Sequence, residues 1–163
     1  MAYISGLDDS ASGGDAQETG GCFLCAAADR DLPDTEYEKR LILKRDEHGI
    51  LMLNRYPYTN GHLLVAPYTH TGDVNDLSPQ QRAGLMELCN LGVALLRKTI
   101  NPQGFNIGMN LGRCAGAGLP GHAHMHVVPR WNGDVNFMQT VGQVRVIPQA
   151  LEESYRMLRS ALA

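Results

Sequence analysis

The sequence lacks three features that would place it quickly in a broad class of proteins. It has no excess of positive charge, because 14 lysines and arginines against 17 aspartates and glutamates give a formal net charge of −3. No segment approaches the roughly 20 apolar residues of a membrane-spanning helix, and the start shows no basic region followed by an apolar one, as a secretory signal would. These absences argue against a nucleic-acid polymer or a membrane as partner, and we expect a cytoplasmic protein.

The length and the cysteine content narrow the class further. The 163 residues suffice for one domain with its own hydrophobic core. Residues 1–21 are rich in glycine, serine and acidic side chains, so we expect a flexible leader there and a single domain over residues 22–163. Four cysteines without a secretory signal are more typical of thiols or metal ligands than of disulfides.

Hydrophobic periodicity predicts an α+β fold with an antiparallel sheet of about five strands and two main helices. Ser78-Pro79-Gln80-Gln81 has the cap, proline and glutamine of a helix start, and apolar residues at spacings of three and four continue the helix to about Ile100. A second helix is expected from Pro148 onward. The strands fall in adjacent groups, as an antiparallel sheet requires: 40–45, 50–54, 62–67, 105–110 and the stretch around 122–128, with 144–147 as a further short candidate.

The most informative stretch is Gly121-His122-Ala123-His124-Met125-His126-Val127, in which three histidines alternate with apolar residues. In a β-strand this alternation places all three imidazoles on one face. A row of imidazoles makes a poor apolar face, so the row indicates chemistry rather than burial. The glycine-rich loop before it can bring backbone N–H groups close to anionic oxygens, which indicates phosphate chemistry. Imidazoles on one face also suit a metal ion, and that alternative stays open here.

A second motif, Cys22-Phe23-Leu24-Cys25, opens the folded part of the chain. In a protein without disulfides, C-x-x-C is either half of a zinc site or a redox pair. The redox version normally follows an apolar strand, whereas this one follows a glycine-rich segment, so we favour a metal or structural role. The pair supplies only two of the four ligands that zinc takes. Two reduced, partly buried thiols are the alternative.

The motif His122-x-His124-x-His126-Val127-Val128 resembles the signature of the HIT (histidine triad) superfamily of nucleotide hydrolases and transferases. The stretches 54–65, 104–108 and 129–134 are similar to its Fhit and diadenosine-tetraphosphate (Ap4A) phosphorylase-like branch. The resemblance implies a HIT-like fold and an enzyme that cleaves dinucleoside polyphosphates at the α-phosphate. Cleavage would pass through a nucleotidyl-histidine intermediate, resolved by phosphorolysis or by hydrolysis.

The resemblance also implies roles for individual residues. His124 would be the nucleophile, His126 would donate to phosphate oxygens, and His122 would complete the catalytic triad. Asn54 and His62 would lie at the nucleoside end of the site. The substrate would be held at the positions that match the family's nucleotide-binding residues: Asn54, His62, Asn110, Gly116 and Gly118. Gly118 is a departure, because many relatives carry Gln or Ser there.

The same resemblance implies a structural zinc site, since four residues match the zinc ligands of a subset of relatives: Cys22, Cys25, His70 and His122. No organic cofactor is expected. Relatives commonly pair, so we expect a homodimer, built partly by the helix of residues 79–100 through Met86 and Val93. The alternative functions are a HINT-like purine nucleoside phosphoramidate hydrolase and a non-catalytic, zinc-stabilised nucleotide-binding protein. A catalytic metal held by the three triad histidines is a further alternative.

Overall fold

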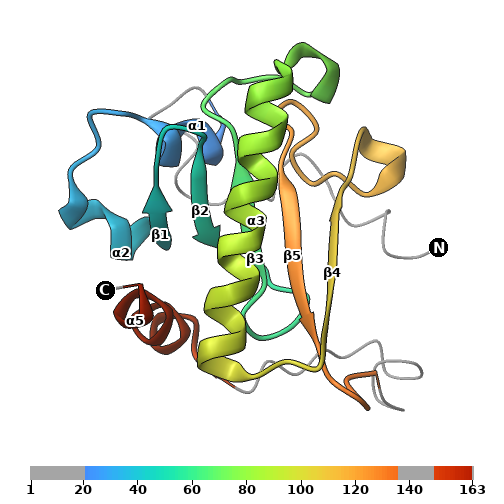
Figure 1. Ribbon diagram of the computed structural model, residues 1–163. Coiled ribbons are helices and arrows are strands. Elements are labelled where there is room, and N and C mark those ends of the chain that lie inside the picture. The colour runs from blue at the N-terminus through green and yellow to red at the C-terminus, as the bar shows by residue number, and fades with distance from the viewer. Residues whose placement is uncertain (1–20, 136–148, 163) are drawn as a thin grey trace.

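The computed structural model describes residues 21–135 and 149–162 (Figure 1). The expected leader, apart from Gly21, and the candidate strand at 144–147 lie outside these ranges. A five-stranded sheet forms the centre, with all neighbours antiparallel and the order β1-β2-β3-β5-β4. This confirms the predicted α+β class and strand number. The strands are β1 (Ile42–Arg45), β2 (Ile50–Leu53), β3 (Leu63–Ala66), β4 (Gly104–Met109) and β5 (Met125–Arg130).

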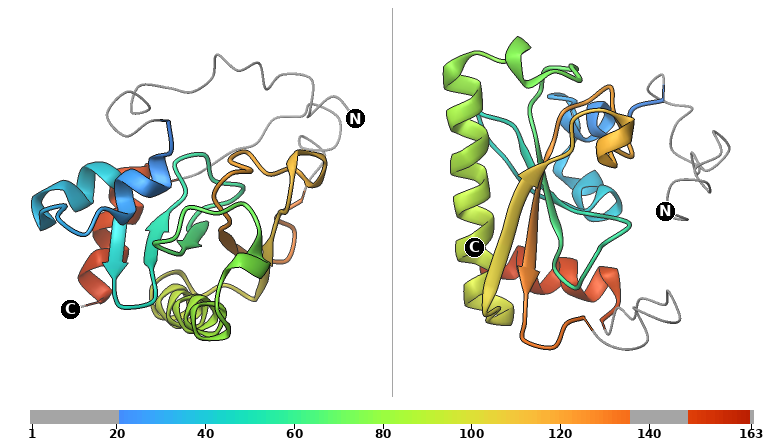
Figure 2. Two further views of the ribbon diagram at one scale, coloured as in Figure 1. Left: turned by 90° about the horizontal axis from the view of Figure 1, so that it is seen from above. Right: turned by 90° about the vertical axis from the view of Figure 1, so that its right-hand side faces the viewer.

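Helix α3 (Pro79–Ile100) runs along one face of the sheet, and α5 (Leu151–Ala161) crosses the end of the sheet and packs against α3 and β1 (Figure 2). Helix α3 begins at a complete capping box, in which the Ser78 N–H donates to Gln81 Oε1 at 2.8 Å and the Gln81 N–H donates to Ser78 Oγ at 3.2 Å. Its bounds are those that the sequence predicted. The opposite side holds α1 (Phe23–Ala28) and α2 (Tyr37–Arg40). Short 3-10 turns complete the described chain: Asp34–Glu36, Val74–Asp76 and Arg113–Ala115.

Alternation along the strands divides the apolar side chains between two cores. One core lies between the sheet and the helices α3 and α5, and includes Leu51, Leu63, Val127, Leu88 and Leu158. The other lies beneath α1, where Leu24 and Ala27 pack on alternate residues of β1 to β3. Each fully buried leucine contributes about 1.5–3 kcal/mol. No helix within the described ranges is long and apolar enough to cross a membrane.

The histidine row differs from its prediction, because β5 begins only at Met125 and contains His126 alone. Pairing of β5 with β3 starts at Met125 opposite Val65, and β3 ends one residue later, at Ala66. Pro67 follows and has no N–H to continue the ladder. His122 and His124 therefore lie in the segment that leads into β5, where their side chains are fixed by individual hydrogen bonds rather than by the sheet.

Candidate functional site

Four residues predicted as metal ligands lie together at the start of α1. The ligand atoms of Cys22, Cys25, His70 and His122 all lie within 4.8 Å of one another. Cys22 Sγ is 3.3 Å from His122 Nδ1, and Cys25 Sγ is 3.4 Å from the same nitrogen and 3.1 Å from His70 Nδ1. In a tetrahedral zinc site, sulfur and nitrogen ligands lie about 3.5 Å apart, given metal–ligand distances of about 2.3 and 2.0 Å. The spacing fits such a site closely.

The orientation of His122 supports the same assignment. Its ring is fully buried, and its Nε2–H donates to the Pro67 carbonyl at 3.0 Å. The proton is therefore on Nε2, and the Nδ1 lone pair points toward the two sulfurs, as a second-shell carbonyl arranges in metal sites. Burial and the neighbouring Cys22 raise the pKa of the Cys25 thiol to about 11. Binding of a metal cation there would thus release protons. The donor set fits zinc, and its closed Cys2His2 composition is typical of a structural site.

His124 is held in one tautomer by its own segment. Its Nδ1–H donates to the carbonyl of His122 at 2.7 Å, and the side chain is only 6% exposed. Because Nδ1 carries the proton, the lone pair of the neutral ring is on Nε2, available for attack on an electrophile. Burial lowers the pKa of His124 below its ordinary value. The ring is therefore neutral and nucleophilic at physiological pH.

His126 is oriented by a different residue, His62, at the start of β3. His62 is fully buried, and its Nδ1 accepts the Tyr58 N–H at 3.0 Å and faces the Asn54 amide nitrogen at 3.2 Å. With Nδ1 an acceptor, the neutral ring of His62 carries its proton on Nε2, which donates to His126 Nδ1 at 2.9 Å. His126 must then carry its own proton on Nε2. That buried nitrogen has no hydrogen-bond partner within the described chain.

A buried N–H group without a hydrogen-bond partner lowers the stability of the fold unless a ligand supplies the acceptor. Burial, and secondarily the proximity of His124, lower the pKa of His126 to about 4, so its ring is neutral as well. The rings of His124 and His126 lie with their centroids 5.0 Å apart. The arrangement therefore places a nucleophilic nitrogen beside a neutral donor that waits for an acceptor. That pairing suits a phosphoryl group, which offers an electrophilic centre surrounded by oxygen acceptors.

A cleft of about 730 Å³ extends from His126 along β4 and β5. Asn106 pairs with Val128, and Gly108 pairs with His126, so the side chains of Asn106, Val128 and His126 project on the same face and Gly108 adds none beside His126. At the far end, Arg130 forms two hydrogen bonds to Asp134, of 2.6 and 2.9 Å, and holds the pKa of that carboxyl at about 2. The rest of the lining combines apolar residues with neutral polar and aromatic ones: Ile107, Met109, Val128 and Val135 with Tyr58, Thr59, Asn60, Asn106, Asn110 and Trp131.

The glycine-rich loop contacts Asn110, which lines the cleft. Gly112 and Gly116 have φ values of +80° and +89°, a left-handed conformation in which any side chain is strained. Between them the 3-10 turn of residues 113–115 reverses the chain, and the Asn110 amide donates to the Gly116 carbonyl at 3.4 Å. A Cβ added at Gly118 would meet no atom within 4 Å. Asn110 and Gly116 are therefore in contact, whereas Gly118 faces open space.

Two contributors to the site were missed by sequence reasoning. Tyr58 supplies the backbone donor to His62, and its ring lies with its centroid 5.7 Å from that of His126, nearly parallel. Asn106 lines the cleft two residues before Gly108. The signal for Asn106 was present, since spacing two along a strand predicts a shared face with Gly108 and Asn110. No sequence pattern identified Tyr58, because its contribution is a backbone N–H, which every residue except proline carries, placed against His62 by the turn between them.

The chain is similar to several known proteins. The HIT domain profile matches residues 35–133. The AP-4-A phosphorylase of Mycobacterium tuberculosis is 39% identical over 133 residues, which cover 82% of this chain and 68% of that protein. A crystal structure of a Zn-bound histidine triad family protein from Mycobacterium smegmatis is 36% identical with a TM-score of 0.67, covering 86% of this chain and 92% of that one. Plasmodium falciparum diadenosine triphosphate hydrolase shares the fold, at 22% identity and a TM-score of 0.62 over 76% of this chain and 77% of its own.

Proposed function

The chain belongs to the HIT domain family, and from that premise we propose that it cleaves dinucleoside polyphosphates of the Ap4A type at the α-phosphorus. Nucleotide hydrolysis or transfer is the activity of the family. The assignment of an Ap4A-type substrate is supported by the 39% identity to a mycobacterial AP-4-A phosphorylase, which extends over 82% of this chain. Residues 22–163 would act as one domain on this small-molecule substrate.

The first step uses the nitrogen that the structure leaves unprotonated. His124 Nε2 attacks the α-phosphorus, an N–P bond forms, and the P–O bond to the departing nucleoside polyphosphate breaks. Positive charge develops on the imidazole and is stabilised by the His122 carbonyl, which accepts from Nδ1 at 2.7 Å. The N–H of His126 donates to an oxygen of the reacting phosphate, where negative charge increases.

The second step returns the enzyme to its starting state. Water or inorganic phosphate attacks the phosphorus of the nucleotidyl-histidine, the N–P bond breaks, and His124 becomes neutral again. Division of one displacement into two easier ones is the general advantage of a covalent intermediate. Asn110 and the backbone around Gly116 supply neutral donors near the phosphates. Neutral donors suit a substrate of high negative charge, since they stabilise the transition state without holding the product by a strong ionic attraction.

Zinc has a structural place in this proposal. Cys22, Cys25, His70 and His122 would hold it, and the metal would contribute rigidity rather than a reactive water. Through His122 the site would fix the carbonyl that orients His124. His124 and His126 therefore remain free for chemistry.

One observation carries the proposal: His124 and His126 are neighbouring neutral rings in complementary tautomers, one with a free lone pair and the other with a free N–H. The test is turnover of Ap4A by the wild type and by His124→Asn, with and without inorganic phosphate. We expect the substitution to lower kcat by about three orders of magnitude or more. ATP and ADP as products would identify phosphorolysis, and ATP and AMP hydrolysis. Activity of His124→Asn within tenfold of the wild type would end the covalent mechanism.

A further inference from the structure

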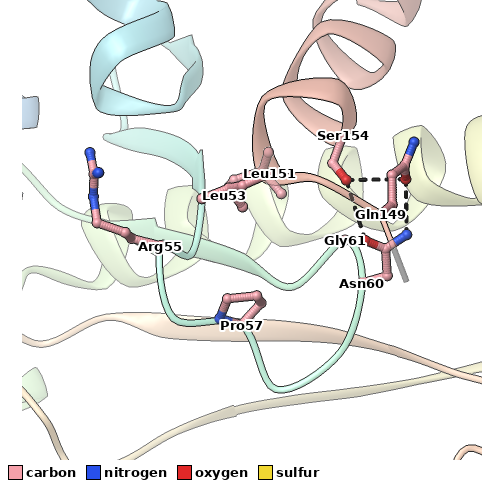
Figure 3. Close-up of a pocket in the computed structure, with 8 residues that line it drawn as sticks. All are labelled: Leu53, Arg55, Pro57, Asn60, Gly61, Gln149, Leu151 and Ser154. Atoms are coloured by element: carbon pink, nitrogen blue, oxygen red, sulfur yellow. Dashed lines mark hydrogen bonds between the residues drawn. The ribbon is translucent and has the colours of Figure 1, made fainter. Parts of the chain in front are cut away.

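A second cavity, of about 250 Å³, lies on the other side of the loop that joins β2 to β3. The loop contributes Pro57, Asn60 and Gly61 to its wall, and the C-terminal segment contributes Gln149, Leu151 and Ser154 (Figure 3). Asn60 lines both this cavity and the cleft that contains His126. Asn60 therefore lies between the cavity beside α5 and the cleft of the candidate active site.

Three side chains join the loop to the helix and form what we call the Asn60 network: Asn60, Gln149 and Ser154. The Asn60 amide donates to Gln149 Oε1 at 2.9 Å. Ser154 Oγ lies 3.1 Å from Gln149 Oε1 and 3.3 Å from Asn60 Oδ1, and its single proton goes to one of these acceptors at a time. Ser154 is only 2% exposed, whereas Asn60 and Gln149 are half-buried. Figure 3 shows all three contacts closing a small ring.

Helix α5, on one side of the network, is attached to the rest of the fold by a buried leucine and two hydrogen bonds. Leu158 is fully buried in the core beside α3, and the Tyr155 hydroxyl donates to the Ile42 carbonyl at 3.1 Å. The Arg159 guanidinium donates to the Leu43 carbonyl on the same strand. Helix α5 is thereby fixed to β1, at the edge of the sheet remote from β4. Ser154, the residue before Tyr155, is thereby held close to the loop.

On the loop side, the two residues before Asn60 form hydrogen bonds with His62. Two residues before Asn60, the Tyr58 N–H donates to His62 Nδ1 at 3.0 Å. One residue before Asn60, the Thr59 carbonyl accepts the His62 N–H at 3.2 Å. The Tyr58 ring lies with its centroid 4.5 Å from that of His62. Movement of Asn60 would therefore displace the Tyr58 N–H, one of the two donors that face His62 Nδ1, and so weaken the preference for the tautomer that donates to His126.

From this geometry we propose that Gln149 and Ser154 are positioning residues for the reaction. Through Asn60 they hold the Tyr58 segment against His62, so that His126 presents its Nε2–H to the substrate. They touch neither substrate nor reacting atoms. The kinetic part of this inference rests on the proposed function, whereas the structural part, the state of His62 and His126, does not.

The kinetic test compares two substitutions at Gln149 that differ in whether an acceptor oxygen remains. Gln149→Leu removes the oxygen that accepts from Asn60 and Ser154, whereas Gln149→Glu keeps an acceptor oxygen there. With Ap4A as substrate, we expect Gln149→Leu to lower kcat about tenfold with little change in KM, and Gln149→Glu to restore most of it. Glu152→Gln, a change at an exposed position in the first turn of α5, is the control. Ser154→Ala gives the same comparison in case Gln149→Leu does not fold.

The second readout needs no turnover. Imidazole ¹⁵N chemical shifts distinguish the two neutral tautomers, so they report directly on His62 and His126 in the substrate-free full chain. We expect both rings to hold the Nε2–H tautomer in the wild type and in Gln149→Glu, and to become mixed in Gln149→Leu. Unchanged tautomers together with a kcat within twofold of the wild type would overturn the inference. Absence of Ap4A turnover in the wild type would instead refute the proposed function, and the ¹⁵N shifts would still decide the role of the network.

Discussion

His62 Nε2 lies 2.9 Å from His126 Nδ1, although 64 residues separate the two in the chain. Because His62 Nδ1 already accepts the Tyr58 N–H, the proton between the two rings belongs to His62. This single contact decides which nitrogen of His126 carries a proton toward the cleft. A residue outside the triad thus sets the chemistry of its third member.

The first prediction concerns this contact. His62→Leu removes the donor to His126 Nδ1, so His126 can adopt the other tautomer and lose its N–H toward the substrate. We expect kcat for Ap4A to fall about 10–100-fold, the range seen when an orienting partner is removed. His62→Gln, whose amide can still donate, should retain more activity than His62→Leu. A kcat for His62→Leu within twofold of the wild type would show that His126 needs no such partner.

The second prediction concerns the metal. Protein purified without added metal should contain about one zinc per chain, as one four-ligand site requires. Cys22→Ser should lower the midpoint of thermal unfolding by about 5–10 °C, because the free energy of metal binding contributes to folding. Cys114→Ser, which changes an exposed cysteine outside the cluster, is the matched control. A metal-free protein in which both variants melt like the wild type would leave Cys22 and Cys25 as ordinary thiols.

The third prediction concerns pH. The pKa of His126 falls from its ordinary value of 6.5 to about 4 in the folded chain, chiefly through burial. His62, His124 and Tyr58 face this ring, and no carboxylate contacts it within the described residues. Between pH 6.5 and pH 4 the unfolded chain therefore binds more protons at this site than the folded one. The stabilisation is complete above pH 6.5 and is lost as the pH falls toward 4.

Urea unfolding at pH 7 and at pH 4.5 measures this effect. Allowing for the partial exposure of the ring, we expect His126 to account for a loss on the order of 1–2 kcal/mol. His126→Asn cannot titrate, so its free energy of unfolding should decline less over the same interval. Equal declines in the two proteins would contradict the assigned shift.

The fourth prediction concerns assembly. Met86 on α3 is 45% exposed, and Val93 on the same helix is only partly buried. Within the described residues β4 pairs with β5 alone, so its outer edge is open, and Ile107 there is 41% exposed. Exposed apolar side chains and an open strand edge both favour a second copy. We expect a homodimer at micromolar concentration by light scattering coupled to size exclusion.

Substitution can locate the dimer interface. Met86→Glu introduces a charge on the exposed side of α3 and should shift the equilibrium toward monomer. Gln80→Glu places the same charge on an exposed position about 1.7 turns earlier and should leave the dimer unchanged. A monomeric wild type would refute the prediction outright.

Features coded locally could be predicted from the sequence. The bounds of α3 follow from Ser78, Pro79 and Gln81 at its start and from Pro102 beyond its end, because capping and proline act over one turn of helix. Short apolar segments bounded by turn residues predicted about five strands, and their adjacent order in the chain predicted antiparallel pairing. The triad and the four candidate metal ligands were identified through a resemblance carried by short motifs, and the structure brings the four ligands within 4.8 Å of one another.

Other properties were decided only by the tertiary structure. The late start of β5 depends on where β3 ends, so the ladder partner rather than the alternation of His122, His124 and His126 determined the strand. The tautomer of His126 depends on His62, and the position of Tyr58 depends on a network that reaches Gln149. No periodic or local sequence pattern predicts hydrogen bonds between side chains so far apart in the chain. They exist only once the sheet, the loop and α5 have packed, because each donor needs an acceptor that another element places within about 3 Å.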